Sequence, residues 1–192
     1  MANLITLAEY KTAEGIQATK DDAKLELLVE SVSQLVKTYC NNTFVDYYST
    51  FKTETFDILY GEKFVQLTES PVVVSEGVTV SQRTEPSASY TTLTENTDFY
   101  VDTKTDSVHH TGTGFNSGYG AVKVVYKAGY AAVPADLKLA VIDLITYYNK
   151  DEHKARQTIA GASIQNQSSS SQRNNVAFPD HIKRVLDLYK NF

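Results

Sequence analysis

The chain has 192 residues, of which 42% are apolar and 21% are charged, and its formal net charge is −5. It is long enough for one large domain or a domain with a substantial insertion, and its acidic balance argues against a protein that grips nucleic acid through phosphates. One cysteine excludes an internal disulfide framework, and the chain shows neither a membrane-span run nor a signal-peptide pattern, so we expect a soluble protein of a reducing compartment.

The first part of the chain, residues 1–42, has a helical pattern. Thr6 followed by Glu9 fits a capping box, and Gly15 suits the end of a short helix. Thr19 followed by Asp22 indicates a second, box-like helix start. Apolar residues then recur at three- and four-residue spacing, which predicts an amphipathic helix with this stripe: Leu25, Leu28, Val29, Val32, Val36, Tyr39 and Cys40.

Residues 43–130 are rich in threonine, valine and aromatic residues and are interrupted by turn residues. This pattern predicts an antiparallel β-module inserted between helical segments. The expected turns are at Gly61, at Ser75–Gly77 and in the glycine-rich run 112–120. The expected strands are Phe44–Tyr48, Phe56–Tyr60, Lys63–Leu67, Val72–Val74, Val78–Val80, Phe99–Val101 and Ala121–Tyr126.

Residues 131–192 return to a helical pattern. A helix from Pro134 to about residue 150 is apolar on more than one side, whereas a helix packed on one core needs only one apolar stripe. Its first stripe is Leu137, Val141, Leu144 and Tyr148, and Leu139, Ile142 and Ile145 continue around the side. Residues 161–177 are polar and without period, which predicts a mobile loop.

A last helix is expected after Pro179, because proline is tolerated at a helix start. Its apolar face contains Ile182, Val185, Leu186 and Tyr189. The predicted fold class is therefore α+β: a small bundle of three to four helices from both chain ends, with the antiparallel β-module inserted between them.

No motif for catalysis, cofactor binding or metal binding stands out. The run GTGFNSGYG at 112–120 lacks the Gly-Lys-Ser/Thr ending of a phosphate loop and leads into a strand. His109 and His110 are adjacent, so in a strand they would point to opposite faces and chelate one metal poorly. Cys40 lies on the core stripe of its helix, where a small buried hydrophobe is the simpler interpretation. We therefore expect no enzyme, no cofactor and no metal.

The thirteen tyrosines leave one alternative function open. Aromatic side chains can line a sugar-binding groove or stack on single-stranded nucleic acid, although the acidic charge opposes the second use. Tyrosines alternating in strands are more often half-buried sheet residues. A β-rich binding module for carbohydrate or protein, carried on a helical base, is the alternative to the interpretation that follows.

Both ends of the chain resemble the head–tail connector proteins of tailed bacteriophages, which are also called head completion or adaptor proteins. The resemblance lies in TLAEYKTAEGI, in TKDDAKLELLVESVSQLVKTYCNNTF with its paired acids Asp21 and Asp22, in YKAGYAAVPADLKLAVIDLITYY and in FPDHIKRVLDLYKNF. The β-module between these segments is longer than in minimal members of that family. The resemblance implies a structural virion protein of the neck, assembled in the host cytoplasm.

The resemblance also implies partners. Such connectors form a ring of roughly a dozen copies under the portal protein, present a platform to the next neck or tail component, and let the genomic DNA pass. The acidic charge agrees with a channel that does not bind phosphates. No membrane partner is expected.

Two surfaces are predicted for these contacts. Because the helix at 134–150 has more apolar surface than one core needs, we expect Leu139, Ile142 and Ile145 to contact the next subunit. The last helix suggests portal docking, with these residues: Phe178, Ile182, Val185, Leu186 and Tyr189. The same residues could instead close the subunit's own bundle, and the sequence leaves both interpretations open.

Overall fold

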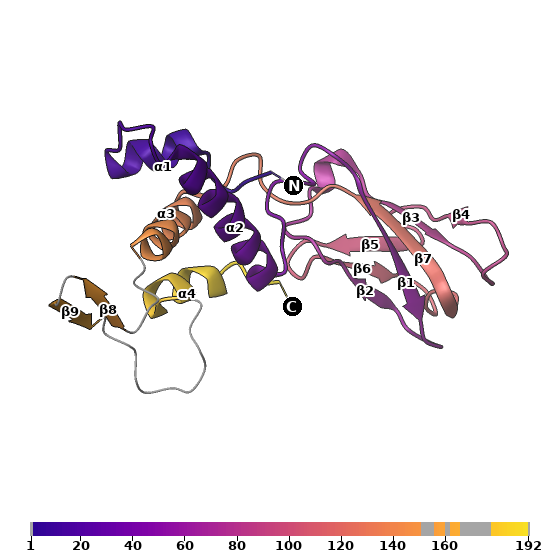
Figure 1. Ribbon diagram of the computed structural model, residues 1–192. Coiled ribbons are helices and arrows are strands. Elements are labelled where there is room, and N and C mark those ends of the chain that lie inside the picture. The colour runs from indigo at the N-terminus through magenta and orange to yellow at the C-terminus, as the bar shows by residue number, and fades with distance from the viewer. Residues whose placement is uncertain (1, 151–155, 160–161, 166–177, 192) are drawn as a thin grey trace. The chain divides into compact units, whose positions relative to one another are not determined.

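The computed structural model describes residues 2–150, 156–159, 162–165 and 178–191. The chain forms two compact units, shown in Figure 1. The β unit comprises Met1–Ala2, Asn41–Ala132 and Asn191–Phe192, and the helical unit comprises Asn3–Cys40 and Val133–Lys190. Helices and antiparallel sheets together confirm the predicted α+β class. No helix among the described residues has the length and apolar character needed to cross a membrane.

Helix α1 of the helical unit (Leu7–Glu14) has the predicted caps. The Thr6 hydroxyl accepts the Glu9 N–H at 3.2 Å, and the Glu9 carboxylate accepts the Thr6 N–H at 2.8 Å. Gly15 ends the helix with a φ of 68°, a left-handed conformation that glycine adopts without steric cost. The capping residues read from the sequence therefore fix both ends of this helix.

Helix α2 (Asp22–Cys40) begins at Asp22, so the predicted capping box from Thr19 is wrong. Asp22 instead lies in the first turn, where its carboxylate accepts a hydrogen bond of 2.6 Å from the Lys11 ammonium. The predicted apolar stripe does face the core: Leu25, Val29, Val32, Val36 and Cys40 are buried. Leu28 and Tyr39 lie at its margin and are half-buried.

Helices α3 (Ala135–Asn149) and α4 (Asp180–Asp187) complete the bundle, and α2, α3 and α4 contact one another. Proline precedes each of them at the N-cap, at Pro134 and Pro179. Strands β8 (Arg156–Ile159) and β9 (Ala162–Gln165) pair antiparallel. The predicted polar loop is therefore wrong at residues 162–165, while 161 and 166–177 lie outside the described residues.

The β unit contains two antiparallel sheets. The first has the order β1 (Lys52–Ile58), β7 (Gly118–Tyr126), β3 (Thr79–Gln82) and β4 (Thr91–Thr92). The second has the order β2 (Phe64–Gln66), β6 (Ser107–His110) and β5 (Phe99–Asp102). Their buried faces share one apolar core, which includes Leu67, Val80, Phe99, Val108, Val122, Val124 and Tyr126.

Several predicted strands are wrong or displaced. Residues 44–48 form a bend and turn, and Phe44 has a positive φ of 67°. Val72 makes only an isolated bridge to Ala128, and a 3-10 turn follows at Val74–Glu76. The strand predicted at 56–60 begins earlier, as β1. Strand β6 was not predicted, because its sequence Ser-Val-His-His lacks the alternation of apolar and polar residues.

The turn at Phe44 is held by a close backbone approach. Gly129 has a φ of 97°, and a Cβ placed there would lie 2.2 Å from the carbonyl oxygen of Phe44. The same oxygen accepts the Tyr130 N–H at 2.6 Å, and Pro71 O accepts the Gly129 N–H at 2.8 Å. Only glycine fits this position, so Gly129 and Tyr130 form a structural junction of the β unit with Phe44.

Candidate functional site

The outer face of α3 is one exposed surface of the helical unit. Leu139 lies there with 59% of its surface exposed, and Ile142, three residues further along, is half-buried. Ile145 is 0% exposed and belongs to the subunit's own core. The predicted subunit interface therefore loses Ile145, because a fully buried side chain offers no surface to a second copy.

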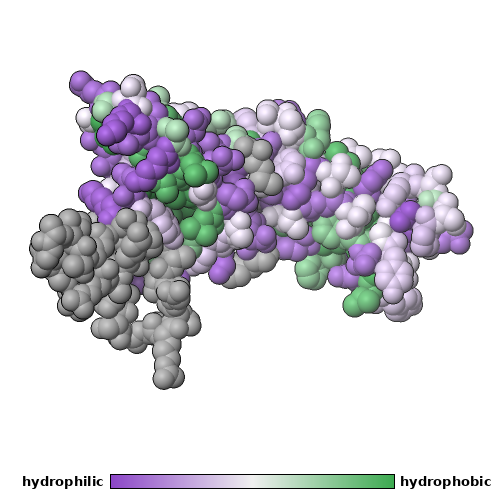
Figure 2. Space-filling model, viewed as in Figure 1, coloured by the Kyte–Doolittle hydropathy of each residue, from purple (hydrophilic) through white to green (hydrophobic). Residues whose placement is uncertain are grey.

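The inner face of α3 accounts for the rest of the apolar surface noted in the sequence. Leu137, Ala140, Val141 and Leu144 are buried with Ile145. Figure 2 shows apolar surface over the helices of this unit, bordered by hydrophilic residues. The helix is thus apolar on a wide core-facing side, while Leu139 and the half-buried Ile142 lie on the outer side.

Most of the residues in the α4 segment predicted for portal docking are buried and are not available on the surface of the subunit. Phe178, Ile182 and Leu186 are 5%, 1% and 0% exposed, so they close the subunit's own bundle. Val185 and Tyr189 are half-buried and remain accessible in part. Of the two interpretations left open by the sequence, the structure supports bundle closure for the three buried residues.

Polar contacts tie α4 and α1 to the bundle. The Tyr39 hydroxyl donates to Asp187 at 2.5 Å, and burial together with this carboxylate raises the pKa of Tyr39 to about 12. Tyr10 and Thr146 share a hydrogen bond of 3.2 Å between their hydroxyls. Cys40, fully buried on α2, has a thiol whose pKa is raised to about 12, mainly by burial and then by the charge of Asp187. Its thiol is therefore protonated and unreactive, as expected for a core residue.

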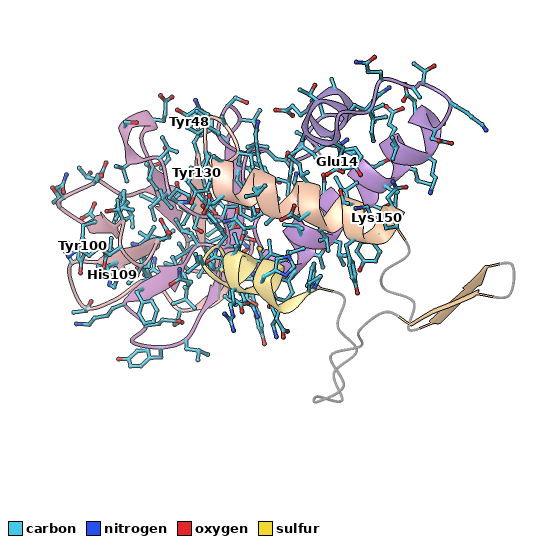
Figure 3. The ribbon with its side chains drawn as sticks, turned by 90° about the vertical axis from the view of Figure 1, so that its left-hand side faces the viewer. Glu14, Tyr48, Tyr100, His109, Tyr130 and Lys150 are labelled. Atoms are coloured by element: carbon cyan, nitrogen blue, oxygen red, sulfur yellow. The ribbon has the colours of Figure 1, made fainter. Side chains whose placement is uncertain are left out.

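An aromatic row crosses the outer face of the β2–β6–β5 sheet and was missed in the sequence. It consists of Phe64, His109 and Tyr100, which are neighbours in the strand register. The His109 ring stacks on Tyr100 at 5.0 Å between centroids and on Phe64 at 5.6 Å. Figure 3 shows Tyr100 and His109 lying side by side. Strand register creates this row, and register is not visible in one sequence.

The stacking also limits what the aromatic row can bind. Both faces of the His109 ring are covered by its neighbours. A sugar-binding platform needs an open ring face, so the His109 ring does not provide one, whereas Phe64 and Tyr100 at the ends of the row remain exposed. The adjacent His110 contacts Phe115 and accepts the Gly112 N–H at 2.9 Å, so the two histidines have separate environments. Among the described residues, no group of three or more His, Cys, Asp or Glu could hold a metal.

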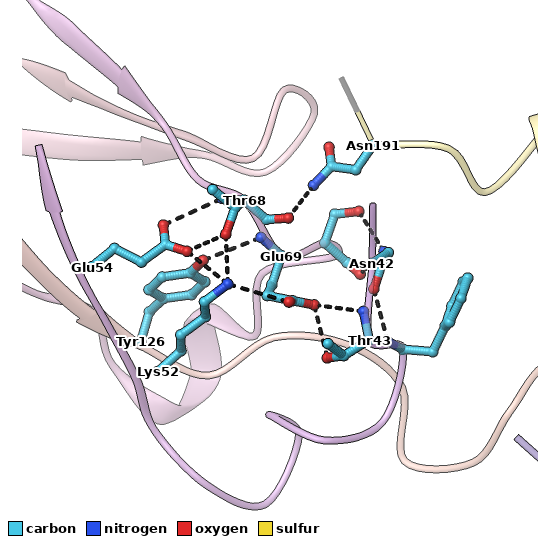
Figure 4. Close-up of polar contacts among 10 residues, drawn as sticks. Asn42, Thr43, Lys52, Glu54, Thr68, Glu69, Tyr126 and Asn191 are labelled. Carbon is cyan, nitrogen blue, oxygen red and sulfur yellow. Dashed lines mark hydrogen bonds and ion pairs between the residues drawn. The ribbon is translucent and has the colours of Figure 1, made fainter. Parts of the chain in front are cut away.

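A buried polar network lies where the chain enters the β unit (Figure 4). Lys52 pairs with Glu54 at 2.8 Å and with Glu69 at 3.2 Å. Glu69 also accepts the N–H and the hydroxyl of Thr43, each at 2.9 Å. Burial lowers the pKa of Lys52, but the two carboxylates outweigh burial and the net pKa is raised. The cation is therefore retained, and it supplies both carboxylates with a positively charged partner.

The network also fastens the last residues of the β unit. The Asn191 amide donates to the Thr68 carbonyl at 2.7 Å, and the Thr68 hydroxyl contacts both Glu54 and Lys52. Asn42, just after α2, donates to the Ser70 carbonyl at 2.8 Å. These contacts stabilise the β unit, and every charged group in them has a partner.

Comparisons with known proteins find related sequences and similar structures. The family model described as "Head completion protein" matches residues 3–192. The head completion protein of Escherichia phage T5 is 29% identical over 77 residues, which are 40% of this chain. That match spans 42% of the length of the phage T5 protein.

Solved structures with a similar fold come from gene transfer agent (GTA) particles. A chain from the neck of the empty particle, with C6 symmetry, has a TM-score of 0.60 at 15% identity; the match covers 98% of this chain and 90% of that one. A chain from the neck of the native particle, with C12 symmetry, has a TM-score of 0.57 at 15% identity. That match covers 100% of this chain and 96% of the other. At this identity the likeness establishes the fold.

Proposed function

The chain belongs to the head completion protein family, and from this premise we propose that it is the structural connector that joins a DNA-filled head to the tail or neck of a virion. The family match over residues 3–192 is the observation that carries the proposal. It confirms the resemblance found in the sequence at both ends of the chain, and it extends that resemblance through the β-module. A role in the virion neck, without catalysis, agrees with the absence of any catalytic motif in the sequence.

The connector is proposed to act as a closed ring beneath the portal. In a cyclic assembly each subunit offers one surface to one neighbour and a different surface to the other. The exposed Leu139 and the half-buried Ile142 are accessible for such a contact. Support for a ring also comes from the similar folds found in necks with C6 and C12 symmetry.

The portal protein and the next neck or tail component are the other proposed partners. Val185 and Tyr189 of α4 remain candidates for portal contact, since both are partly accessible. Genomic DNA is proposed to pass through the ring without tight binding. The net charge of −5 supports this, because each phosphate contact would add affinity and slow the movement of DNA.

The mass of the purified protein, measured by light scattering alone and with its portal protein, tests the proposal. A closed ring of roughly a dozen copies, formed alone or only on the portal, is the expected result. A strict monomer that does not bind the portal would overturn it. A portal variant that lacks the surface proposed to contact the connector serves as the control, because specific docking should be lost with it.

A further inference from the structure

We propose that the outer face of α3 in one copy packs against the outer face of α4 in the next copy of the ring. The inference rests on the proposed ring and names the two surfaces that meet within it. The α3 face is defined by Asp136, Leu139 and Asp143, and the α4 face by His181, Arg184 and Leu188. Each subunit would use α3 toward one neighbour and α4 toward the other, as a closed cyclic assembly requires.

The α3 face combines an apolar side chain with negative charge. Asp136 and Asp143 lie three residues before and four residues after Leu139, so the three side chains share one side of the helix. The hydrogen bond from Tyr189 to Asp136, 2.6 Å long, lowers the pKa of that carboxyl and keeps it ionised. The nearby cation, Lys138, is already paired with Glu9 at 2.6 Å. Within the described part of the chain no ion pair joins Asp136 or Asp143 to a cation, so the face carries negative charge around an exposed leucine.

The α4 face has the complementary character. His181 and Arg184 lie three residues apart on α4, and Leu188, the C-cap residue, follows four residues after Arg184. Leu188 is 78% exposed, and His181 and Arg184 are exposed as well. Two acids lie near Arg184: Asp180, four residues before it, and Asp187, three residues after it, whose carboxylate accepts the Tyr39 hydroxyl. This face therefore offers a leucine near the guanidinium of Arg184, which can pair with Asp143 of the next copy.

Charge favours this pairing over a contact between the α3 face and the aromatic row of the β unit. Copies with a net charge of −5 repel one another, so a stable contact needs local pairing of opposite charges. The aromatic row Phe64–His109–Tyr100 has the carboxylate of Asp102 two residues beyond Tyr100 on the same face of the sheet. It does not complement the acidic α3 face, whereas α4 does. Packing Leu139 and Leu188 together would also remove both leucines from water.

Disulfide cross-linking between full-length variants tests the contact. Leu139→Cys and Leu188→Cys are purified separately, mixed in equal amounts and oxidised, with the native Cys40 left in place because it is fully buried. Dimers that join the Leu139→Cys variant to the Leu188→Cys variant should exceed the dimers of either variant with itself, taken together, by about tenfold. Random collision would instead form the mixed and the like dimers in comparable total amounts. Leu27→Cys, at a leucine 64% exposed on α2, is the matched control and should show no preference for Leu188→Cys.

A charge exchange provides the second arm. Asp143→Arg alone and Arg184→Asp alone should each reduce the mixed cross-link about fivefold, and the two changes in one chain should restore it. A random distribution of dimers, or no restoration by the exchange, overturns the inference. The mass of the same samples with the portal is measured in parallel. A ring without the mixed cross-link refutes only these surfaces, while the absence of any ring refutes the proposed function as well.

Discussion

Replacing Leu139 by lysine should abolish the ring while leaving the subunit folded. Because 59% of this side chain is already exposed in the isolated subunit, less than half of a leucine's burial energy is at stake there. Full burial of leucine is worth about 2 kcal/mol, so the subunit should lose at most about 1 kcal/mol of stability. The aliphatic part of lysine should reduce this loss further, because it can cover the same apolar surface.

The cost at the subunit contact should be larger. Removing the apolar contact and placing an ammonium beside a basic helix face should weaken each contact by about 2 kcal/mol, which corresponds to roughly thirtyfold. Every contact in a closed ring carries the same change, so assembly should be lost. Urea unfolding measures the subunit, and light scattering with the portal measures the ring.

Leu144→Ala is the matched control on the opposite face of α3. Leu144 is 0% exposed, so its truncation should cost about 2–5 kcal/mol of subunit stability while the remaining folded protein still assembles. The reasoning about helix faces would be refuted by either of two results: Leu139→Lys unfolds the subunit, or it leaves the ring intact.

Three further predictions concern the stability of the subunit. Gly129→Ala should lower the free energy of unfolding by more than about 3 kcal/mol, because the new Cβ would collide with the Phe44 carbonyl. Gly61 has a similar φ but open space around it, so Gly61→Ala is the control and should cost about 1 kcal/mol. Equal losses for the two variants in urea unfolding would contradict the close approach at Gly129. Lys52→Met should lower the free energy of unfolding by about 3 kcal/mol at neutral pH, and by progressively less as the pH falls and its two partner carboxylates protonate. A loss of stability that does not change with pH would show that the two carboxylates are not its cause. The hydrogen bond from Lys138, followed by that from the Thr6 N–H, lowers the pKa of Glu9 to about 2, so its stabilising effect should be present above the ordinary glutamate pKa and disappear as the pH falls toward 2. Glu9 is 43% exposed, so Glu9→Gln should cost at most about 1 kcal/mol, and a cost that grows on acidification would have the wrong sign.

The helices could be predicted from the sequence because their signals are local. The Thr6–Glu9 box and Gly15 mark α1, and the spacing of buried residues marks α2. Proline at 134 and 179 marks the starts of α3 and α4. Each of these signals lies within a few residues of the feature it determines.

The β unit was harder to predict, because its pairings join distant segments. Strand β7 pairs with both β1 and β3, and no local pattern specifies that choice. The bend at Phe44 depends on Gly129, 85 positions later in the chain. The aromatic row likewise joins three strands and exists only once their register is known.

The candidate surfaces were predicted only in part. Periodicity showed that α3 is apolar on more than one side, but it could not show how wide the core-facing side is. Ile145 therefore looked available although it is buried, and Leu139 remained exposed as expected. On α4 the prediction was based on the apolar stripe, most of which is buried. The exposed side contains Arg184 and Leu188, which do not belong to that stripe.

Electron microscopy of particles assembled without this chain tests the central claim most directly. If the protein joins head to tail, such preparations should contain DNA-filled heads and separate tails, and the wild-type chain should restore complete particles. The Leu139→Lys chain should fail to do so while Leu139→Met succeeds. Complete, tailed particles in the absence of the chain would contradict its role as the connector.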